Sequence, residues 1–79
     1  MNRGKIFEKL TNIFQIVFDD DSLVIGEKTT AADIEEWDSF EHVRLIVAIE
    51  NNFQIKFNMI EMSKFKNVGE MVDAIESKL

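Results

Sequence analysis

The stretch EEWDSFEHV, residues 35–43, places a serine hydroxyl between a carboxylate and an imidazole. Asp38, Ser39 and His42 are the residue types of a hydrolytic triad, and residues three apart on a helix can touch. The chain lacks the G-x-S-x-G turn that exposes the nucleophile of many hydrolases, and no oxyanion hole is evident. We therefore expect no enzymatic activity, and we expect His42 to be a helix residue that packs beside Trp37.

A different role for Ser39 follows from the residue before it. Asp38 followed three residues later by Glu41 favours a helix start at which the Asp38 side chain accepts a backbone N–H. Ser39 then occupies the first helical position, where its hydroxyl is not needed for capping and points outward. A serine in a first turn is often only a compatible polar residue. The residues alone leave open whether this hydroxyl is inert or used.

The composition argues against several kinds of site. The chain has no cysteine and one histidine, which disfavours thiol chemistry and metal sites built from Cys or His. The DDD run at 19–21 is not a calcium loop, because Leu23 stands at a ligand position and Thr30 where a bidentate glutamate is required. The net charge of −6 disfavours nucleic acid and membrane surfaces and favours partners with basic patches. We expect a cytoplasmic monomer without a bound metal or a membrane-inserted segment.

Apolar periodicity and helix-start signals predict four helices. From residue 4 onward, apolar side chains recur at spacings of three and four, which is the stripe of an amphipathic helix. The segments DSFE, NMIE and NVGE each place Asp or Asn three residues before Glu, and each predicts a capping box at a later helix start. The predicted helices cover residues 4–18, 39–53, 59–65 and 68–78.

The connections are predicted to be irregular. Residues 19–37 show no sustained period, although TAAD (Thr30 to Asp33) favours one helical turn, and Leu23, Ile25 and Ile34 can anchor the segment to the core. FQIKF alternates like a strand but has no partner strand, so we expect an extended linker. The predicted fold class is all-α: a small four-helix bundle of three longer helices and one short helix, with a long first loop. We expect one domain spanning residues 1–79.

The predicted helix 39–53 carries two apolar faces. Leu45, Ile46, Ile49 and Phe53 form a core stripe. A second stripe lies on another side of the helix, close to Ser39. Either the long first loop covers this stripe, or the stripe is a partner-docking surface with an acidic rim. The residues that we assign to docking are Asp38, Phe40, Glu41, Val43, Val47 and Glu50.

The segment WDSFEHVRLIVAIENNFQIKF resembles the serine-bearing segment of acyl carrier proteins, in which Asp-Ser-Leu opens the second helix. NVGEMVDAIESKL resembles the last helix of that family, and the chain length and the order of elements are similar as well. The resemblance covers nearly all of the chain. The Asp-Ser-apolar triplet alone is a weak signal, but the combination is specific.

The resemblance implies that Ser39 is the attachment point of a 4′-phosphopantetheine arm. A phosphopantetheinyl transferase installs this arm from coenzyme A with Mg²⁺, and acyl groups are carried as thioesters on its thiol. The chain has no thiol of its own, so the arm must supply one. The free amides and dipole at a helix start suit a phosphodiester. The implied partners are acyl-loading and acyl-processing enzymes with basic docking patches.

Three departures from the family pattern leave the cargo open. Phe40 replaces the usual leucine after the serine, and Arg44 and Asn51 occupy positions that are often acidic in carriers of primary fatty-acid synthesis. These departures weigh against the carrier of primary fatty-acid synthesis, and we expect a stand-alone carrier that docks on fatty-acid, polyketide or other specialised biosynthetic enzymes. The alternatives are a D-alanyl carrier, an aminoacyl or peptidyl carrier, and an unmodified helical protein-interaction module.

Overall fold

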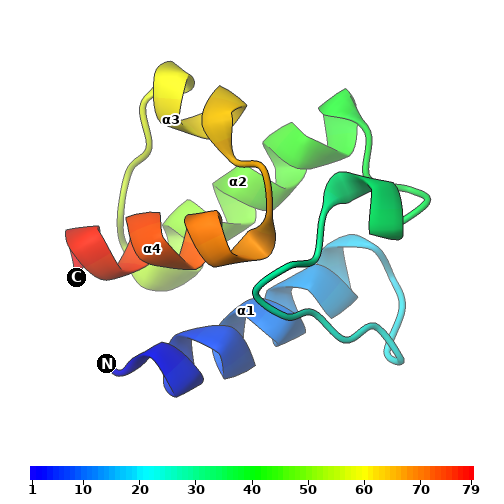
Figure 1. Cartoon of the computed structure of the whole chain (residues 1–79), viewed down its shortest axis with the longest axis horizontal. Helices are drawn as coiled ribbons and strands as arrows, with labels where there is room; N and C mark the ends of the chain where they lie inside the picture. Colours follow the sequence, from blue (N-terminus) through cyan, green and yellow to red (C-terminus); the bar gives the residue numbers. More distant parts are fainter.

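The computed structural model describes all of residues 1–79 and contains four α-helices, one 3₁₀ turn and no strand. This confirms the predicted all-α bundle. In Figure 1, α1 lies at the bottom, the short α3 at the top and the long loop at the right. The elements are α1 (Arg3–Val17), η1 (Ala31–Asp33), α2 (Ser39–Phe53), α3 (Met59–Lys64) and α4 (Val68–Lys78).

One apolar core joins these elements. Eighteen buried hydrophobic residues form a single cluster, and no polar or charged residue is buried with them. α1 packs against both α2 and α4. The predicted core stripe of α2 is confirmed, because Leu45, Ile46, Ile49 and Phe53 are all buried. Ile55 and Phe57 are buried in the linker after α2, which is irregular as predicted.

Each α-helix begins with an Asp or Asn whose side chain accepts the amide three residues later, and this fixes the helix starts. In two of the three predicted capping boxes, the glutamate does not accept the backbone amide of the cap residue, so this part of the prediction is wrong. Only the Glu61 carboxylate accepts the amide of its own cap residue, Asn58, at 3.0 Å. Glu41 instead pairs with Arg44, and Glu70 accepts the amide of Lys66. A nearby cation or a second free amide competes for each carboxylate.

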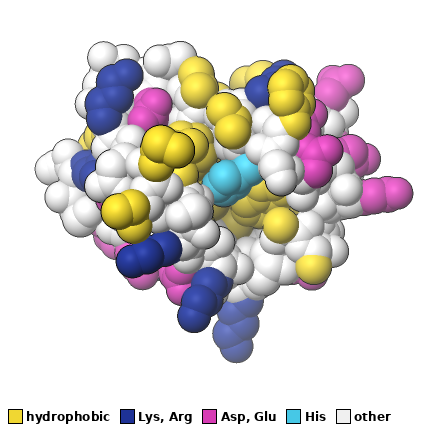
Figure 2. All heavy atoms as spheres, turned by 90° about the horizontal axis from the view of Figure 1, so that it is seen from above, with side chains coloured by type: hydrophobic (Ala, Val, Ile, Leu, Met, Phe, Trp, Pro, Cys, Tyr) yellow, Lys and Arg dark blue, Asp and Glu magenta, His cyan; other side chains and the backbone are white.

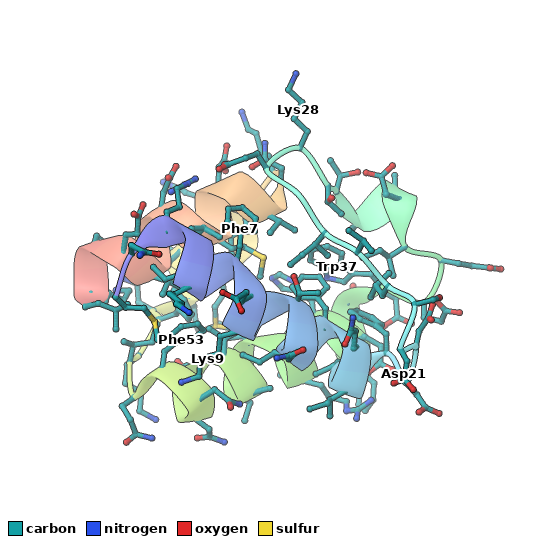
Figure 3. All side chains as sticks on the ribbon, turned by 90° about the horizontal axis from the view of Figure 1, so that it is seen from below. Phe7, Lys9, Asp21, Lys28, Trp37 and Phe53 are labelled. Atoms are coloured by element: carbon teal, nitrogen blue, oxygen red, sulfur yellow. The ribbon has the colours of Figure 1, made fainter.

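The long loop, residues 18–38, is held at several points. Ile25 and Ile34 are buried as predicted, and Leu23 packs against the core. The Asp33 carboxylate accepts the Thr30 amide at 2.9 Å and closes the single turn η1. Figure 3 shows the side chain of Trp37 between α1 and the backbone of the loop. The loop is thus an ordered part of the fold, and it can position residues beside the start of α2.

An ionic cluster around Arg3 connects the loop to the first helix, α1, and to the last helix, α4. The Arg3 guanidinium donates two hydrogen bonds to the Glu27 carboxylate, at 2.7 and 2.8 Å, and also contacts Asp73 and Glu76 of α4. The hydrogen bond from Arg3 lowers the pKa of Glu27 below 4.5. This carboxylate therefore favours the folded state above pH 4.5, and its contribution is lost as the pH falls through the lowered pKa.

A close backbone contact joins the same part of the loop to the start of α4. The Val68 amide donates to the Thr29 carbonyl at 2.8 Å, and the Gly69 amide donates to the Glu27 carbonyl at 2.9 Å. A Cβ atom on Gly69 would lie 2.7 Å from a Glu27 carboxylate oxygen and 2.8 Å from the Glu27 carbonyl oxygen. Only glycine allows this approach of two backbones.

Gly69→Ala should therefore lower the free energy of unfolding by about 1–3 kcal/mol, because the added methyl group pushes the loop away from α4. Gly4→Ala is a matched control, since Gly4 is also the second residue of its helix and its Cβ would meet nothing closer than 3.4 Å. That change should stabilise the protein by up to about 1 kcal/mol. Urea unfolding measures both variants, and equal effects would contradict the close contact.

Candidate functional site

The candidate site is the N-terminus of α2, where Ser39 is the first helical residue. The Asp38 side chain accepts a hydrogen bond from the Glu41 amide at 2.9 Å, which confirms the predicted cap. Because Asp38 satisfies this amide, the helix start makes no demand on the Ser39 hydroxyl. Ser39 is exposed, and its hydroxyl makes no hydrogen bond within the chain.

Ser39 differs in this respect from every other hydroxyl residue. The hydroxyls of Ser22, Ser63 and Ser77 each donate a hydrogen bond, at 2.6, 2.9 and 2.8 Å, to an oxygen within three residues. All three threonine hydroxyls are hydrogen-bonded as well, and the chain has no tyrosine. Ser39 therefore carries the one hydroxyl that a reagent can use without breaking an internal hydrogen bond.

His42 ties two other segments to this part of α2. The Trp37 indole N–H donates to His42 Nδ1 at 3.0 Å, and the two rings stack with centroids 5.9 Å apart. An indole N–H can only donate, so Nδ1 is the acceptor and the ring proton lies on Nε2. That N–H donates to the Met62 carbonyl oxygen, 2.9 Å from Nε2. The predicted packing of His42 beside Trp37 is confirmed.

These two hydrogen bonds also show whether Asp38, Ser39 and His42 form a hydrolytic triad. A general base for Ser39 needs an unprotonated imidazole nitrogen that accepts the serine proton. In this structure Nδ1 already accepts from Trp37, and Nε2 carries a proton that it gives to Met62. Neither nitrogen of His42 is placed to activate the hydroxyl, so Asp38, Ser39 and His42 do not form a triad.

A pocket of about 480 Å³ lies beside Ser39, between the long loop, α2 and the end of α3. Figure 2 looks onto this region, where the imidazole of His42 lies among hydrophobic side chains. Lys66 is the one lysine or arginine at the pocket, and it makes no ion pair within the chain. The pocket is lined by Ala31, Trp37, Asp38, Ser39, His42, Met62, Ser63, Phe65 and Lys66.

The second apolar stripe of α2 is open to solvent. Phe40, Val43 and Val47 are 72%, 51% and 49% exposed, so the long loop does not cover them. This leaves partner docking as the interpretation of the stripe, although docking itself stays a prediction. We call these three residues the apolar strip.

The two predicted docking glutamates are less free than the sequence suggests. The Glu41 carboxylate lies 2.6 Å from Arg44 Nη1, in an ion pair along the helix. The Glu50 carboxylate accepts the Phe57 amide at 2.8 Å, and Glu50 is half-buried. Glu50 thus stabilises the linker after α2 as well as lying near the strip. Replacing it would disturb the fold together with any docking.

Other kinds of site find no support in the geometry. No group of three or more His, Cys, Asp or Glu side chains converges in a way that could hold a metal ion. None of the helices combines the length and the hydropathy needed to cross a bilayer.

Comparison with known proteins identifies the fold and the family. No family profile matches the chain. A solution structure of holo acyl carrier protein from Geobacter metallireducens superposes with a TM-score of 0.86 at 47% identity, covering 91% of this chain and 83% of that one. An acyl carrier protein of Thermosynechococcus vestitus is 33% identical over all of this chain and 98% of its own length. The chain belongs to the acyl carrier protein family.

Further acyl carrier proteins match over similar spans. That of Thermotoga maritima is 30% identical over 99% of this chain and 96% of its own length. That of Coprothermobacter proteolyticus is 32% identical over all of this chain and 96% of its own length. The family suggested by the DSF triplet and the last helix is therefore confirmed. The sequence did not reveal the Met62 carbonyl as a partner of His42, because a backbone acceptor in another helix leaves no mark on residue spacing.

The two hydrogen bonds of His42 lead to a testable prediction. His42→Ala should lower the free energy of unfolding by about 1–3 kcal/mol, because the half-buried indole N–H of Trp37 and the Met62 carbonyl both lose their hydrogen-bond partner. Emission of Trp37, the single tryptophan, should shift to longer wavelength. Asn51→Ala is a control on the same helix, since the Asn51 side chain is exposed and makes no hydrogen bond. If the two variants unfolded at the same urea concentration, the hydrogen bonds of His42 would contribute nothing to stability.

Proposed function

We propose that this protein is a carrier rather than an enzyme, and that Ser39 carries a 4′-phosphopantetheine arm. The observation that carries the proposal is the state of its hydroxyl: exposed, at the start of a 15-residue helix, and the only one in the chain without an internal hydrogen bond. The family membership and the holo form of the Geobacter relative support the same assignment. Residues 1–79 act as a single carrier domain in this proposal.

The residues around Ser39 fit a phosphodiester. The start of α2 offers free backbone amides and the positive end of a helix dipole, both of which favour negative charge. Lys66 at the adjacent pocket supplies a cation that forms no ion pair with a carboxylate of the chain. Apolar surface from Trp37, Met62 and Phe65 lies in the same pocket. The arm, when bound, supplies the thiol that this cysteine-free chain lacks.

The proposed role is transport of acyl groups between cytoplasmic enzymes. Acyl thioesters formed on the arm are presented to enzymes of fatty-acid, polyketide or another specialised biosynthesis, which bind the apolar strip and its acidic rim transiently. A carrier must dissociate after each transfer, so a small interface that weakens with salt suits it. The protein acts as a monomer, and a separate phosphopantetheinyl transferase modifies it with coenzyme A and Mg²⁺.

The arm is tested by the intact mass of the protein after incubation with a phosphopantetheinyl transferase, coenzyme A and Mg²⁺. The mass should rise by one phosphopantetheinyl group, and Ser39→Ala should abolish the rise. Ser63→Ala is the matched control, because Ser63 lines the same pocket but its hydroxyl is bonded to the Ile60 carbonyl; it should be modified like the wild type. No gain of mass with several promiscuous transferases would instead favour an unmodified interaction module.

A further inference from the structure

A second hollow lies where the end of α1 meets the middle of α2. Its volume is about 440 Å³, and Ile16 and Val17 of α1 face Val43, Val47 and Ala48 of α2 across it. We call it the α1–α2 groove. The apolar strip supplies one wall through Val43 and Val47, and Ile16, 78% exposed, supplies the other. The exposed apolar surface of α2 therefore continues onto a second helix.

Ile16 is not part of the core, so burial does not explain why a large hydrophobic residue stands at this position. The buried face of α1 consists of Ile6, Leu10, Ile13, Phe14 and Val17, and Ile16 lies outside it. A β-branched residue on the exposed side of a helix brings no helix propensity and loses side-chain entropy. Its large apolar side chain gains free energy only if something covers it. The same holds for the half-exposed valines opposite.

The charges around the groove indicate what can cover it. Carboxylates are dense at this end of the molecule, and in Figure 2 several of them gather at the right-hand side, toward the long loop. The one cation that lines the groove, Arg44, is paired with Glu41 at 2.6 Å and repels a basic partner little. Of the carboxylates in the loop between α1 and α2, three lie just after the end of α1 and three just before the start of α2: Asp19, Asp20, Asp21, Glu35, Glu36 and Asp38.

The exposed apolar residues of α3 have the opposite surroundings. Met59 and Ile60 are 84% and 64% exposed, so their hydrophobic area alone would also suit docking. The flanking charges are Lys56, Lys64 and Lys66. The single carboxylate of this segment is already paired, because Glu61 lies 3.0 Å from the Lys78 ammonium. An enzyme surface rich in Lys and Arg is attracted to the α1–α2 side and repelled by α3.

We propose that the enzyme that modifies Ser39 docks across α2 onto α1, and seats an apolar side chain framed by Lys or Arg in the α1–α2 groove. The proposal rests on the function proposed for Ser39. Val43 and Val47 follow Ser39 by four and eight residues, which is roughly 6 and 12 Å along the helix. An interface of ordinary size that encloses Ser39 therefore reaches the groove. Ile16 is a recognition residue in this arrangement, remote from the reacting atoms.

The test is the kinetics of arm transfer to Ile16→Gln and to its matched control Ile60→Gln. Both replace an exposed isoleucine of a helix with a residue that keeps the helix and removes apolar surface. Ile16→Gln should raise the KM of the transferase for the apo protein about tenfold and leave kcat within about twofold, because a remote contact stabilises ground and transition states alike. Ile60→Gln should change KM by less than about twofold. Calorimetric titration of the apo protein into transferase without coenzyme A should show the same loss of affinity for Ile16→Gln alone.

Two results would overturn the inference. One is a KM for Ile16→Gln within about twofold of the wild-type value, and the other is a KM for Ile60→Gln that rises as much as that for Ile16→Gln. If the wild-type protein accepted no arm at all, the proposed function would fail, and the docking inference with it. Normal modification of the wild type with an unchanged KM for Ile16→Gln overturns the docking inference alone.

Discussion

The hydrogen bond from the Glu41 amide to the Asp38 carboxylate is the contact on which the site depends. A helix start leaves several amides without partners, and a serine at the N-cap position can accept a hydrogen bond from one of them. Here the preceding aspartate takes that role, so Ser39 enters the first helical position with an unengaged hydroxyl. The same helix start then offers that hydroxyl a positive electrostatic environment. If the helix began one residue later, Ser39 would itself be the N-cap, and its hydroxyl would be used for capping instead of being free for attachment.

The surroundings of Ser39 are assembled from three separate segments, and His42 holds them together. Its ring accepts from Trp37 at the end of the long loop and donates to the Met62 carbonyl in α3. Trp37 in turn packs edge-on against Phe14 of α1, with ring centroids 5.3 Å apart. The pocket beside Ser39 thus depends on the core through aromatic contacts. The Arg3 cluster and the Gly69 contact hold another part of the same loop, around Glu27, against the starts of α1 and α4.

Local signals predicted the helices well, because a cap acts over three residues and leaves its mark in the sequence. The predicted bounds of α2 and α4 agree with the structure, and those of α1 and α3 differ by one residue. The partners of Glu41 and Glu70 were missed, since each carboxylate chooses among several nearby donors by geometry. Contacts between distant segments depend on how the helices pack. These are the hydrogen bonds from Arg3 to Glu27 and α4, and the groove that Ile16 shares with Val47. The docking stripe was located from helical periodicity, but its extension onto α1 needed the fold.

The most direct test of the account is to map where the arm is attached. The chain has four serines, and the structure leaves the hydroxyl of one of them free. Wild-type protein treated with transferase and coenzyme A is digested, and fragmentation of the peptides by mass spectrometry locates the added group. The account predicts that all of it lies on Ser39. Modification of Ser22, Ser63 or Ser77 would contradict it, because each of those hydroxyls is engaged within the fold.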